Sequence, residues 1–338
     1  MEIRELKQLI KAAARPTAGV VFSDAQSAAK NAIKAHFGLD DISLRDVRRY
    51  GGEIFALIDE VVEEVLPELL ESRIGMFAEM KTYGRDEIVK FIVRGVGKNR
   101  VARGIVPGAR GGLYRARRLD DREFMLPTKV HTVGYQITLE ELLSGRRTIA
   151  ELVEIIARGF EEIVYMEVIA AVRAAKTAAP AANITSANGI NDANLRGLVR
   201  VVSAYGRPVI LAFQSEAEKF VNVAGASSAY TPNIPTEDLS EIRNQGMISV
   251  YYGTPVVVLP NYLKDETNAE WVFEETDIFV LPVDEKPVKV AFKGDLYTAE
   301  VPQPHGGMEY HAHRIMGVGV LFYNHVAVYT DLGDAIGS

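Results

Sequence analysis

Hydrophobic residues recur at helical spacing from Thr148 to Thr177, a stretch with no proline and a single glycine, Gly159. Thr148 followed three residues later by Glu151 forms a capping box, which is typical of a helix start. At ~1.5 Å per residue the predicted helix is a rod of roughly 45 Å, about twice the length of an ordinary globular helix. Such a rod needs an extended partner surface, although the stretch alone also fits the main helix of an ordinary α+β domain.

Three shorter amphipathic helices are predicted before it, over residues 1–15, 24–37 and 52–72. A proline or a glycine follows each of the first two, and Pro67 is expected to kink or break the third. Their apolar faces are short and need a partner. We therefore expect residues 1–75 to form a helical arm that lies on the body of its own chain or on a neighbouring subunit.

Strand-like alternation at 76–91 and 123–138 flanks the most biased segment of the chain, Arg94–Leu119. Its six glycines predict a long excursion and not a packed element. The segment contains no acidic residue, and its basic residues are Arg94, Lys98, Arg100, Arg103, Arg110, Arg115, Arg117 and Arg118.

Three interpretations of this basic loop stay open. Arginine neutralises phosphate and glycine lets a backbone approach it, so the loop fits a nucleic-acid contact. It also fits a solvated flexible loop. The third interpretation is a docking arm whose arginines meet carboxylates on another copy, and the net charge of −7 gives the chain the sign that this contact requires.

Beyond the long helix, Ala178–Asn194 is rich in alanine, asparagine, glycine and serine and is expected to be an exposed linker. Helices and strands then alternate, which indicates helices around a mixed sheet, before the chain becomes mostly strand. The last strands need a sheet to join, and we expect the one beside the long helix. Helices are predicted at 195–205, 215–221 and 236–245, and strands at 208–213, 248–252, 255–260, 278–283, 288–292, 296–301, 309–318 and 320–329.

The composition of the 338 residues, 48% hydrophobic and 25% charged, is ordinary for a soluble protein. Cysteine is absent, which excludes disulfides, a thiol nucleophile and thiolate metal ligands. The N-terminus is charged and amphipathic, unlike a secretory signal, and no apolar run approaches the ~20 residues of a membrane span. We expect a cytosolic protein without a membrane partner.

The familiar nucleotide-binding patterns fail in this sequence. Lys98 is followed by Asn99 where the Walker pattern needs Ser or Thr, and Gly317-Val318-Gly319 lacks the third glycine of the dinucleotide fingerprint. No G-x-S-x-G elbow is present either. The sequence therefore predicts no catalytic residue, no cofactor and no enzyme.

One cluster has the character of metal ligands. A strand would place Glu309, His311 and His313 on one face, and two imidazoles with a carboxylate suit a facial metal site. The exposed rim of a sheet often brings such residues together by chance, and we expect no metal there.

Three local stretches add to the order of the parts: YQITLEEL at 135–142, IFVLPV at 278–283 and RIMGVGV at 314–320. With that order, the chain resembles the major capsid proteins of tailed bacteriophages, which have the Hong Kong 97 fold. The resemblance implies an α+β fold with an N-terminal helical arm, an extended β-hairpin loop, a long spine helix beside a peripheral sheet, and an α/β axial domain. The implied boundaries are 1–75 for the arm, 76–177 with 284–338 for the peripheral domain, 178–283 for the axial domain, about 90–132 for the extended loop and 148–177 for the spine.

This resemblance implies a major capsid protein that self-assembles into pentamers and hexamers of an icosahedral head around double-stranded DNA. The implied partners are further copies of the chain, portal and scaffolding proteins, a decoration protein, and packaged DNA without sequence-specific contacts. The protein would be located in the virion and assembled in the host cytoplasm, with the eight basic residues of 94–118 as an inter-subunit docking loop.

Two alternatives stay open. An encapsulin-type nanocompartment shell shares the fold but holds cargo enzymes in place of DNA. A nucleic-acid-binding protein would act through the basic loop at 94–118 and bind DNA with a steep salt dependence.

Overall fold

The computed structural model describes residues 59–64, 66–67, 70–71, 74–93, 122–138, 149–225, 250–302 and 307–333. The predicted helices at 1–15, 24–37 and 236–245 lie outside the described residues, as does the whole basic segment 94–119. The described residues of the predicted helix 52–72 are helical.

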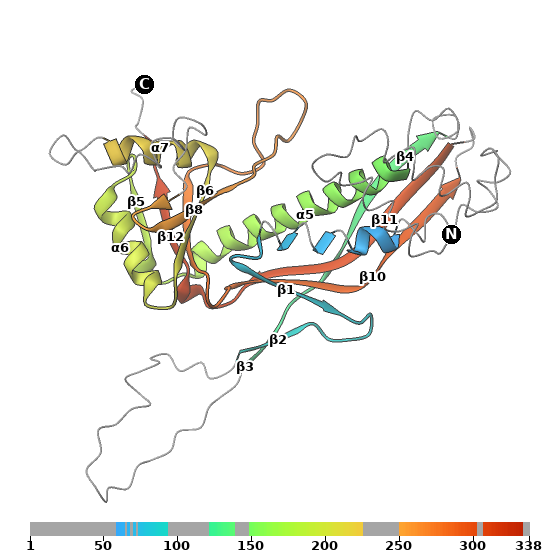
Figure 1. The fold of residues 1–338 in the computed structure, drawn as a ribbon, viewed down its shortest axis with the longest axis horizontal. Helices are drawn as coiled ribbons and strands as arrows, with labels where there is room; N and C mark the ends of the chain where they lie inside the picture. The colour runs from blue at the N-terminus through green and yellow to red at the C-terminus, as the bar shows by residue number, and fades with distance from the viewer. Residues whose placement is uncertain are drawn as a thin grey trace, which may run out of the picture.

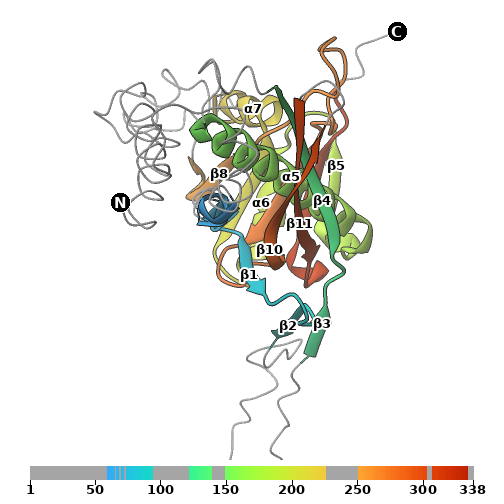
Figure 2. The ribbon, with the colours of Figure 1, turned by 90° about the vertical axis from the view of Figure 1, so that its right-hand side faces the viewer.

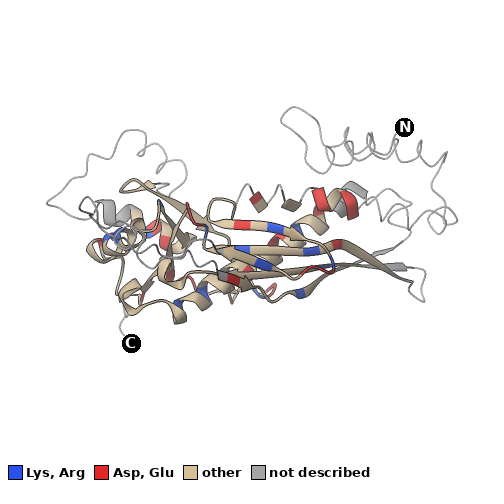
Figure 3. Ribbon diagram, turned by 90° about the horizontal axis from the view of Figure 1, so that it is seen from below, with Lys and Arg blue, Asp and Glu red and all other residues tan. Residues whose placement is uncertain are grey.

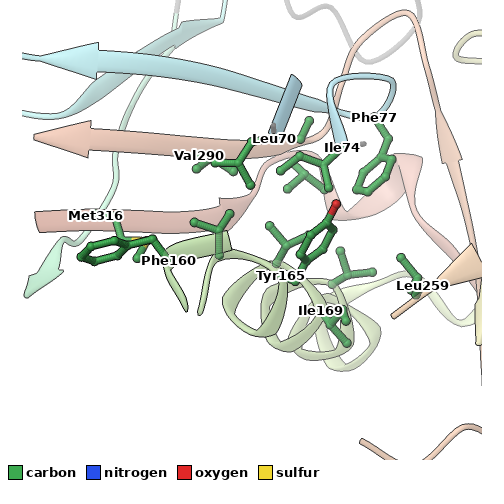
Figure 4. Packing of buried hydrophobic residues seen from close by; sticks show 14 of the residues in the cluster. Leu70, Ile74, Phe77, Phe160, Tyr165, Ile169, Leu259, Val290 and Met316 are labelled. Atoms are coloured by element: carbon green, nitrogen blue, oxygen red, sulfur yellow. The ribbon is translucent and has the colours of Figure 1, made fainter. Parts of the chain in front are cut away.

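The helix α5 (Ile149–Ala178) spans 30 residues and confirms the prediction from periodicity. Its buried side chains include Phe160, Val164, Val168 and Ile169, which lie on one face of the helix at spacings of four positions or one. Figure 4 shows this stripe facing Leu70, Ile74 and Val290 across the largest core. The helix therefore needs, and has, an apolar surface along much of its length.

A four-stranded sheet lies along α5 (Figure 1). Its order is β1 (Ala78–Tyr83), β10 (Val288–Pro302), β11 (Gly307–Val320) and β4 (Lys129–Thr138), with β1 parallel to β10 and the other pairs antiparallel. The two predicted strands at 288–292 and 296–301 are one strand, because β10 continues through an irregularity between Lys293 and Tyr297.

A short hairpin, β2 (Lys90–Val93) and β3 (Arg122–Met125), leaves this sheet (Figure 2). Val89 and Phe91 pack on Ala291 and Leu321. Ala291 points away from α5, since its neighbours Val290 and Phe292 belong to the core under that helix. The hairpin thus covers part of the sheet face opposite α5.

The second sheet has six strands in the order β5-β12-β9-β6-β8-β7. The helices α6 (Asp192–Ser203) and α7 (Gln214–Gly225) pack on one face, and α5 lies on the other. Side chains of its central strands alternate between the two cores: Phe279 lies on the α5 side and Val280 on the α6 side. The strands are β5 (Ile184–Ala187), β6 (Pro208–Phe213), β7 (Val250–Tyr251), β8 (Thr254–Leu259), β9 (Asp277–Pro282) and β12 (Ala327–Asp331).

Two sequence predictions are wrong here. The expected linker at 178–194 forms the short 3₁₀ helix η1 (Ala181–Asn183) and then β5, and the Asn183 amide is buried, donating to the carbonyls of Asn324 and Val326. The expected strand at 320–329 is interrupted at Phe322, which has φ 62, and by η2 (Tyr323–His325).

The strand that follows, β12, joins the six-stranded sheet between β5 and β9 and not the four-stranded sheet that β11 joins. The predicted division into peripheral and axial domains stays a prediction. None of the helices in the described part of the chain combines the length and apolar character that a membrane crossing requires.

Candidate functional site

The stem of the predicted docking loop lies within the described residues, and the eight basic residues of the loop lie outside them. Val93 pairs with Arg122 at the end of the β2–β3 ladder, so the two ends of the intervening segment start side by side. Lys90 and Glu123 bridge the stem at 3.3 Å. The β2–β3 pairing brings the two ends of the predicted loop together, while the loop itself and the role of its basic residues stay predictions.

The histidines of the predicted metal cluster lie on β11, on the sheet face that turns away from α5. His311 and His313 have ring centroids 6.3 Å apart, and Thr132 Oγ1 lies 2.8 Å from His313 Nδ1. The side chain of Glu309 is outside the described set. Among the described residues, no group of three or more His, Asp or Glu side chains could hold a metal ion.

Gly317 and Gly319, which fail as a nucleotide motif, have a packing role instead. A Cβ on Gly317 would lie 2.4 Å from the Pro127 carbonyl oxygen, and one on Gly319 would lie 2.5 Å from Leu126 Cδ1. The segment that joins β3 to β4 therefore passes directly over β11, and at Gly317, where the close atom belongs to the backbone, only glycine leaves room for it.

A polar cluster fixes the N-terminal helical segment to the bulged part of β10. Asp59 accepts hydrogen bonds from the Thr298 amide and hydroxyl, and Glu63 accepts from the Leu296 amide. Burial raises the pKa of Asp59 to about 6, although the bonds from Thr298 act in the opposite direction. This cluster ties the segment 59–64 to the four-stranded sheet.

Buried cations hold both faces of the same sheet. Lys289 pairs with Glu79 and is 5% exposed, and burial lowers the pKa of its ammonium group. On the opposite face Arg314, 4% exposed, lies 3.5 Å from Glu63 and over the Phe292 ring at 4.9 Å. Such buried charges require their partners, since an unpaired one is expensive to bury.

Two buried carboxylates lie at the same edge of the six-stranded sheet, Asp277 at the start of β9 and Asp331 at the end of the neighbouring β12, and they point to opposite faces. Asp277 accepts from Lys176 of α5 at 2.7 Å and from the Thr330 hydroxyl at 2.8 Å. Asp331 accepts from Lys219 of α7 at 2.6 Å and from the amides of Gly189 and Gly333. These bonds fasten a helix to each face of the sheet.

Desolvation opposes the charge on Asp331, yet the Lys219 and amide bonds hold the pKa of this carboxyl below its usual value. Burial instead raises the pKa of Glu216, which shares Lys219 at 2.6 Å. The ammonium group therefore serves two carboxylates of different proton affinity.

A hairpin at residues 262–276, between β8 and β9, projects from this sheet (Figure 1). The Val272 amide donates to the Tyr262 carbonyl, and the Asn261 amide group donates to the Phe273 carbonyl and the Glu275 carboxylate. At its base lies an open cavity of about 450 Å³, lined by residues that include Tyr165, Leu259 and Trp271. The hairpin is braced at its base, and sequence patterning did not predict it.

Acidic and basic positions alternate along α5 and the four-stranded sheet, as Figure 3 shows, and do not form a patch of one sign there. The described residues thus include buried ion pairs that join helices to sheets and a projecting hairpin. These are features suited to contact with other macromolecules.

Comparison with known proteins gives the family. Residues 9–329 match the model of the family described as "SPbeta prophage-derived putative capsid protein YonB". No match was found among curated protein sequences.

Solved structures show the fold. The capsid of an empty GTA particle is similar with a TM-score of 0.51 at 13% identity, covering 76% of this chain and 89% of that one. The mature capsid of bacteriophage PhiM1 matches at 0.49 and 10% identity, over 77% and 86% of the two chains. A virus-like particle from Pyrococcus furiosus matches at 0.43 and 11% identity, over 79% and 97%.

The predicted fold of the Hong Kong 97 type rests on the first of these structures and on the spine helix with its sheet. The family model covers nearly the whole chain, including both sheets. The chain therefore belongs to the family of phage-derived capsid proteins that this model describes.

Proposed function

We propose that this chain is the major shell subunit of a phage-type head and assembles into the pentamers and hexamers of an icosahedral particle. The observation that carries the proposal is the family match over residues 9–329, together with a fold that is similar to a capsid subunit. The virion is then the location of the mature protein, and its assembly takes place in the host cytoplasm.

The described part of the chain supports a role as a structural protein. Its buried ion pairs fasten helices to sheets, as Lys176 does with Asp277, and they do not converge on a cavity where substrate could react. We propose double-stranded DNA as the enclosed content, held without sequence-specific contacts, because a net charge of −7 disfavours tight binding to phosphates. Portal and scaffolding proteins, with a decoration protein, complete the proposed set of partners.

Electron microscopy of the purified recombinant protein, alone and across a range of salt concentrations, tests this function. Closed shells or rings of five and six are the expected result. Nucleic acid inside the particles supports a phage head, whereas folded protein cargo supports the nanocompartment alternative. A protein that stays monomeric with and without a co-expressed scaffold contradicts the proposal.

The basic loop provides a second test of the same function. We propose that its arginines dock on a neighbouring copy, so replacing Arg115, Arg117 and Arg118 with glutamate should block assembly and leave the subunit folded. Circular dichroism verifies the fold, and microscopy scores the shells. Normal shells from this triple variant would exclude the loop as a docking arm, and a steep salt dependence of DNA binding by wild-type subunits would favour the nucleic-acid alternative.

A further inference from the structure

The projecting hairpin carries a concentrated negative charge. Residues 262–276, called the acidic hairpin below, contain five acidic residues and a single lysine. Asp265, Glu266 and Glu270 lie at its exposed tip, and Lys264 balances only Glu270, at 2.9 Å. Leu263 and Trp271 face each other across the hairpin and are 37% and 51% exposed. Such a combination of an exposed aromatic anchor and a charged rim is typical of a protein interface.

A positive surface of matching character lies on α6. Between Ala193 and Arg207 the chain has three arginines and no acidic residue, although Arg196 pairs at 3.5 Å with Asp192, one helical turn before it. Leu195, Leu198 and Val202 turn inward, so Arg196 and Arg200, one helical turn apart, face outward. Arg196 also lies over the ring of Tyr252 at 5.3 Å, and that ring is 67% exposed. Arg196, Arg200 and Tyr252 are called the arginine face below.

These two surfaces lie on opposite sides of the six-stranded sheet. The hairpin is fixed to the α5 side, where Phe273 stacks on Phe213 at 6.4 Å and Arg173 lies over Phe273. The arginine face belongs to the side covered by α6, and Figure 1 shows the hairpin and α6 on either side of the strands. One copy therefore cannot bring its own two surfaces together.

We propose that the acidic hairpin of one copy docks on the arginine face of the next copy. Because the two surfaces differ, the contact is head-to-tail, and repeated head-to-tail contacts close into rings when the rotation between copies allows it. The charges have complementary sign, and Trp271 and Leu263 supply apolar area beside the exposed ring of Tyr252. This inference rests on the proposed shell function and assigns a contact that would build its rings.

Charge-reversal variants test the contact. Glu266→Lys with Glu270→Lys reverses the hairpin, and Arg196→Glu with Arg200→Glu reverses the helix. Each double variant is expected to weaken ring or shell formation about tenfold or more, because like charges then face each other. Combining all four changes in one chain restores assembly. The exposed pair Asp86→Lys with Glu162→Lys changes the net charge by the same amount as the hairpin variant, and it should assemble normally.

Mixing separates a head-to-tail contact from other arrangements. In an equimolar mixture of the hairpin variant and the helix variant, the lysines of one chain meet the glutamates of the other, and the native charges meet at the next contact. Alternation closes only in rings of even number, so hexamers return in the mixture and pentamers do not. Circular dichroism verifies that each variant is folded, and native mass spectrometry counts the subunits.

Trp271 gives an independent readout because it is the only tryptophan of the chain. Its emission should shift to the blue and its quenching by acrylamide should fall when wild-type subunits assemble.

The contact is wrong if wild-type rings form while Trp271 stays equally quenched, if the folded variants assemble like wild type, or if the control pair fails equally. Rescue of the hairpin variant by reversing Arg115, Arg117 and Arg118, and not by the α6 changes, would assign the hairpin to the basic loop and contradict this contact. A wild type that remains monomeric with and without a co-expressed scaffold contradicts the shell function itself.

Discussion

The two sheets differ in how their faces are covered. In the six-stranded sheet, α5 lies on one face and α6 with α7 on the other, and every residue of β9 is buried. In the four-stranded sheet, α5 covers one face, but beyond the β2–β3 hairpin the described residues leave Tyr297 66% and Val130 63% exposed on the other. Among the described residues, the first sheet is therefore covered on both faces, whereas the second leaves part of one face exposed.

Truncating one aromatic side chain in each sheet tests this difference with the largest effect. Phe279→Ala on β9 empties a site in the core below α5 and should lower the free energy of unfolding by about 3–5 kcal/mol. Tyr297→Ala removes a side chain from the exposed face and should change that energy by about 0.5 kcal/mol or less. Urea denaturation of unassembled subunits measures both. Equal losses would show that the two faces are covered alike.

Crowding a glycine tests a place where the segment 126–128 lies close against the sheet face opposite α5. Gly317→Ala places a methyl group against the Pro127 carbonyl oxygen and should lower the free energy of unfolding by about 1–3 kcal/mol. Gly197→Ala is the matched control, because a Cβ there meets nothing within 4 Å and alanine favours the α6 helix by about 0.5–1 kcal/mol. The same denaturation experiment compares them, and a stabilised Gly317→Ala variant would show that the segment at 126–128 does not press on β11.

Periodicity predicted the spine helix and most strands because their core faces repeat regularly. The bounds of α5 differ from the prediction by one residue at each end, and β6 matches its predicted bounds, 208–213. Alternation also predicted strands at 76–91 and 123–138, which flank the loop, whereas the pairing of β2 with β3 followed only from the family resemblance. These elements bury continuous apolar stripes, which is the signal that a sequence displays directly.

Elements that depend on distant partners were missed. The stretch at 178–194 looks like a linker because its residues are small and polar, yet β5 forms since β12 supplies its ladder from more than 140 positions away. Sequence patterning missed the acidic hairpin because residues distant in the chain brace it, through the hydrogen bonds of Asn261 and the stacking of Phe273 on Phe213. The closely spaced Gly317 and Gly319 are visible in the sequence, but their spacing alone does not predict that the segment at Leu126 and Pro127 lies over them.

Removing one charge from the six-stranded sheet should have a moderate effect. Asp331→Asn weakens the bond from Lys219 of α7 to β12 and should lower the free energy of unfolding by about 1–2 kcal/mol at pH 7. Because the folded protein holds the pKa of Asp331 below its ordinary value of 3.8, the contribution is present above pH 3.8 and is lost as the pH falls through the lower folded value. Denaturation midpoints should therefore differ at pH 7 and converge at acidic pH. A constant difference would assign the loss to packing.

Titrating Asp59 should produce the smallest effect and the opposite pH dependence, in the four-stranded sheet. Its folded pKa of about 6 lies above the ordinary 3.8, so its contribution to stability is fully present below pH 3.8 and is lost as the pH rises through 6. The side chain of Asp59→Asn cannot ionise, so between pH 4 and 7 the variant should become more stable than the wild type. The difference in free energy of unfolding should be less than about 1 kcal/mol, because the carboxyl is partly solvated. Hydrogen exchange at the Thr298 amide, which donates to Asp59, reports the effect locally. In the wild type its protection should fall over this pH range relative to the variant, whereas parallel profiles would mean that Asp59 stays ionised and that this cluster does not respond to pH.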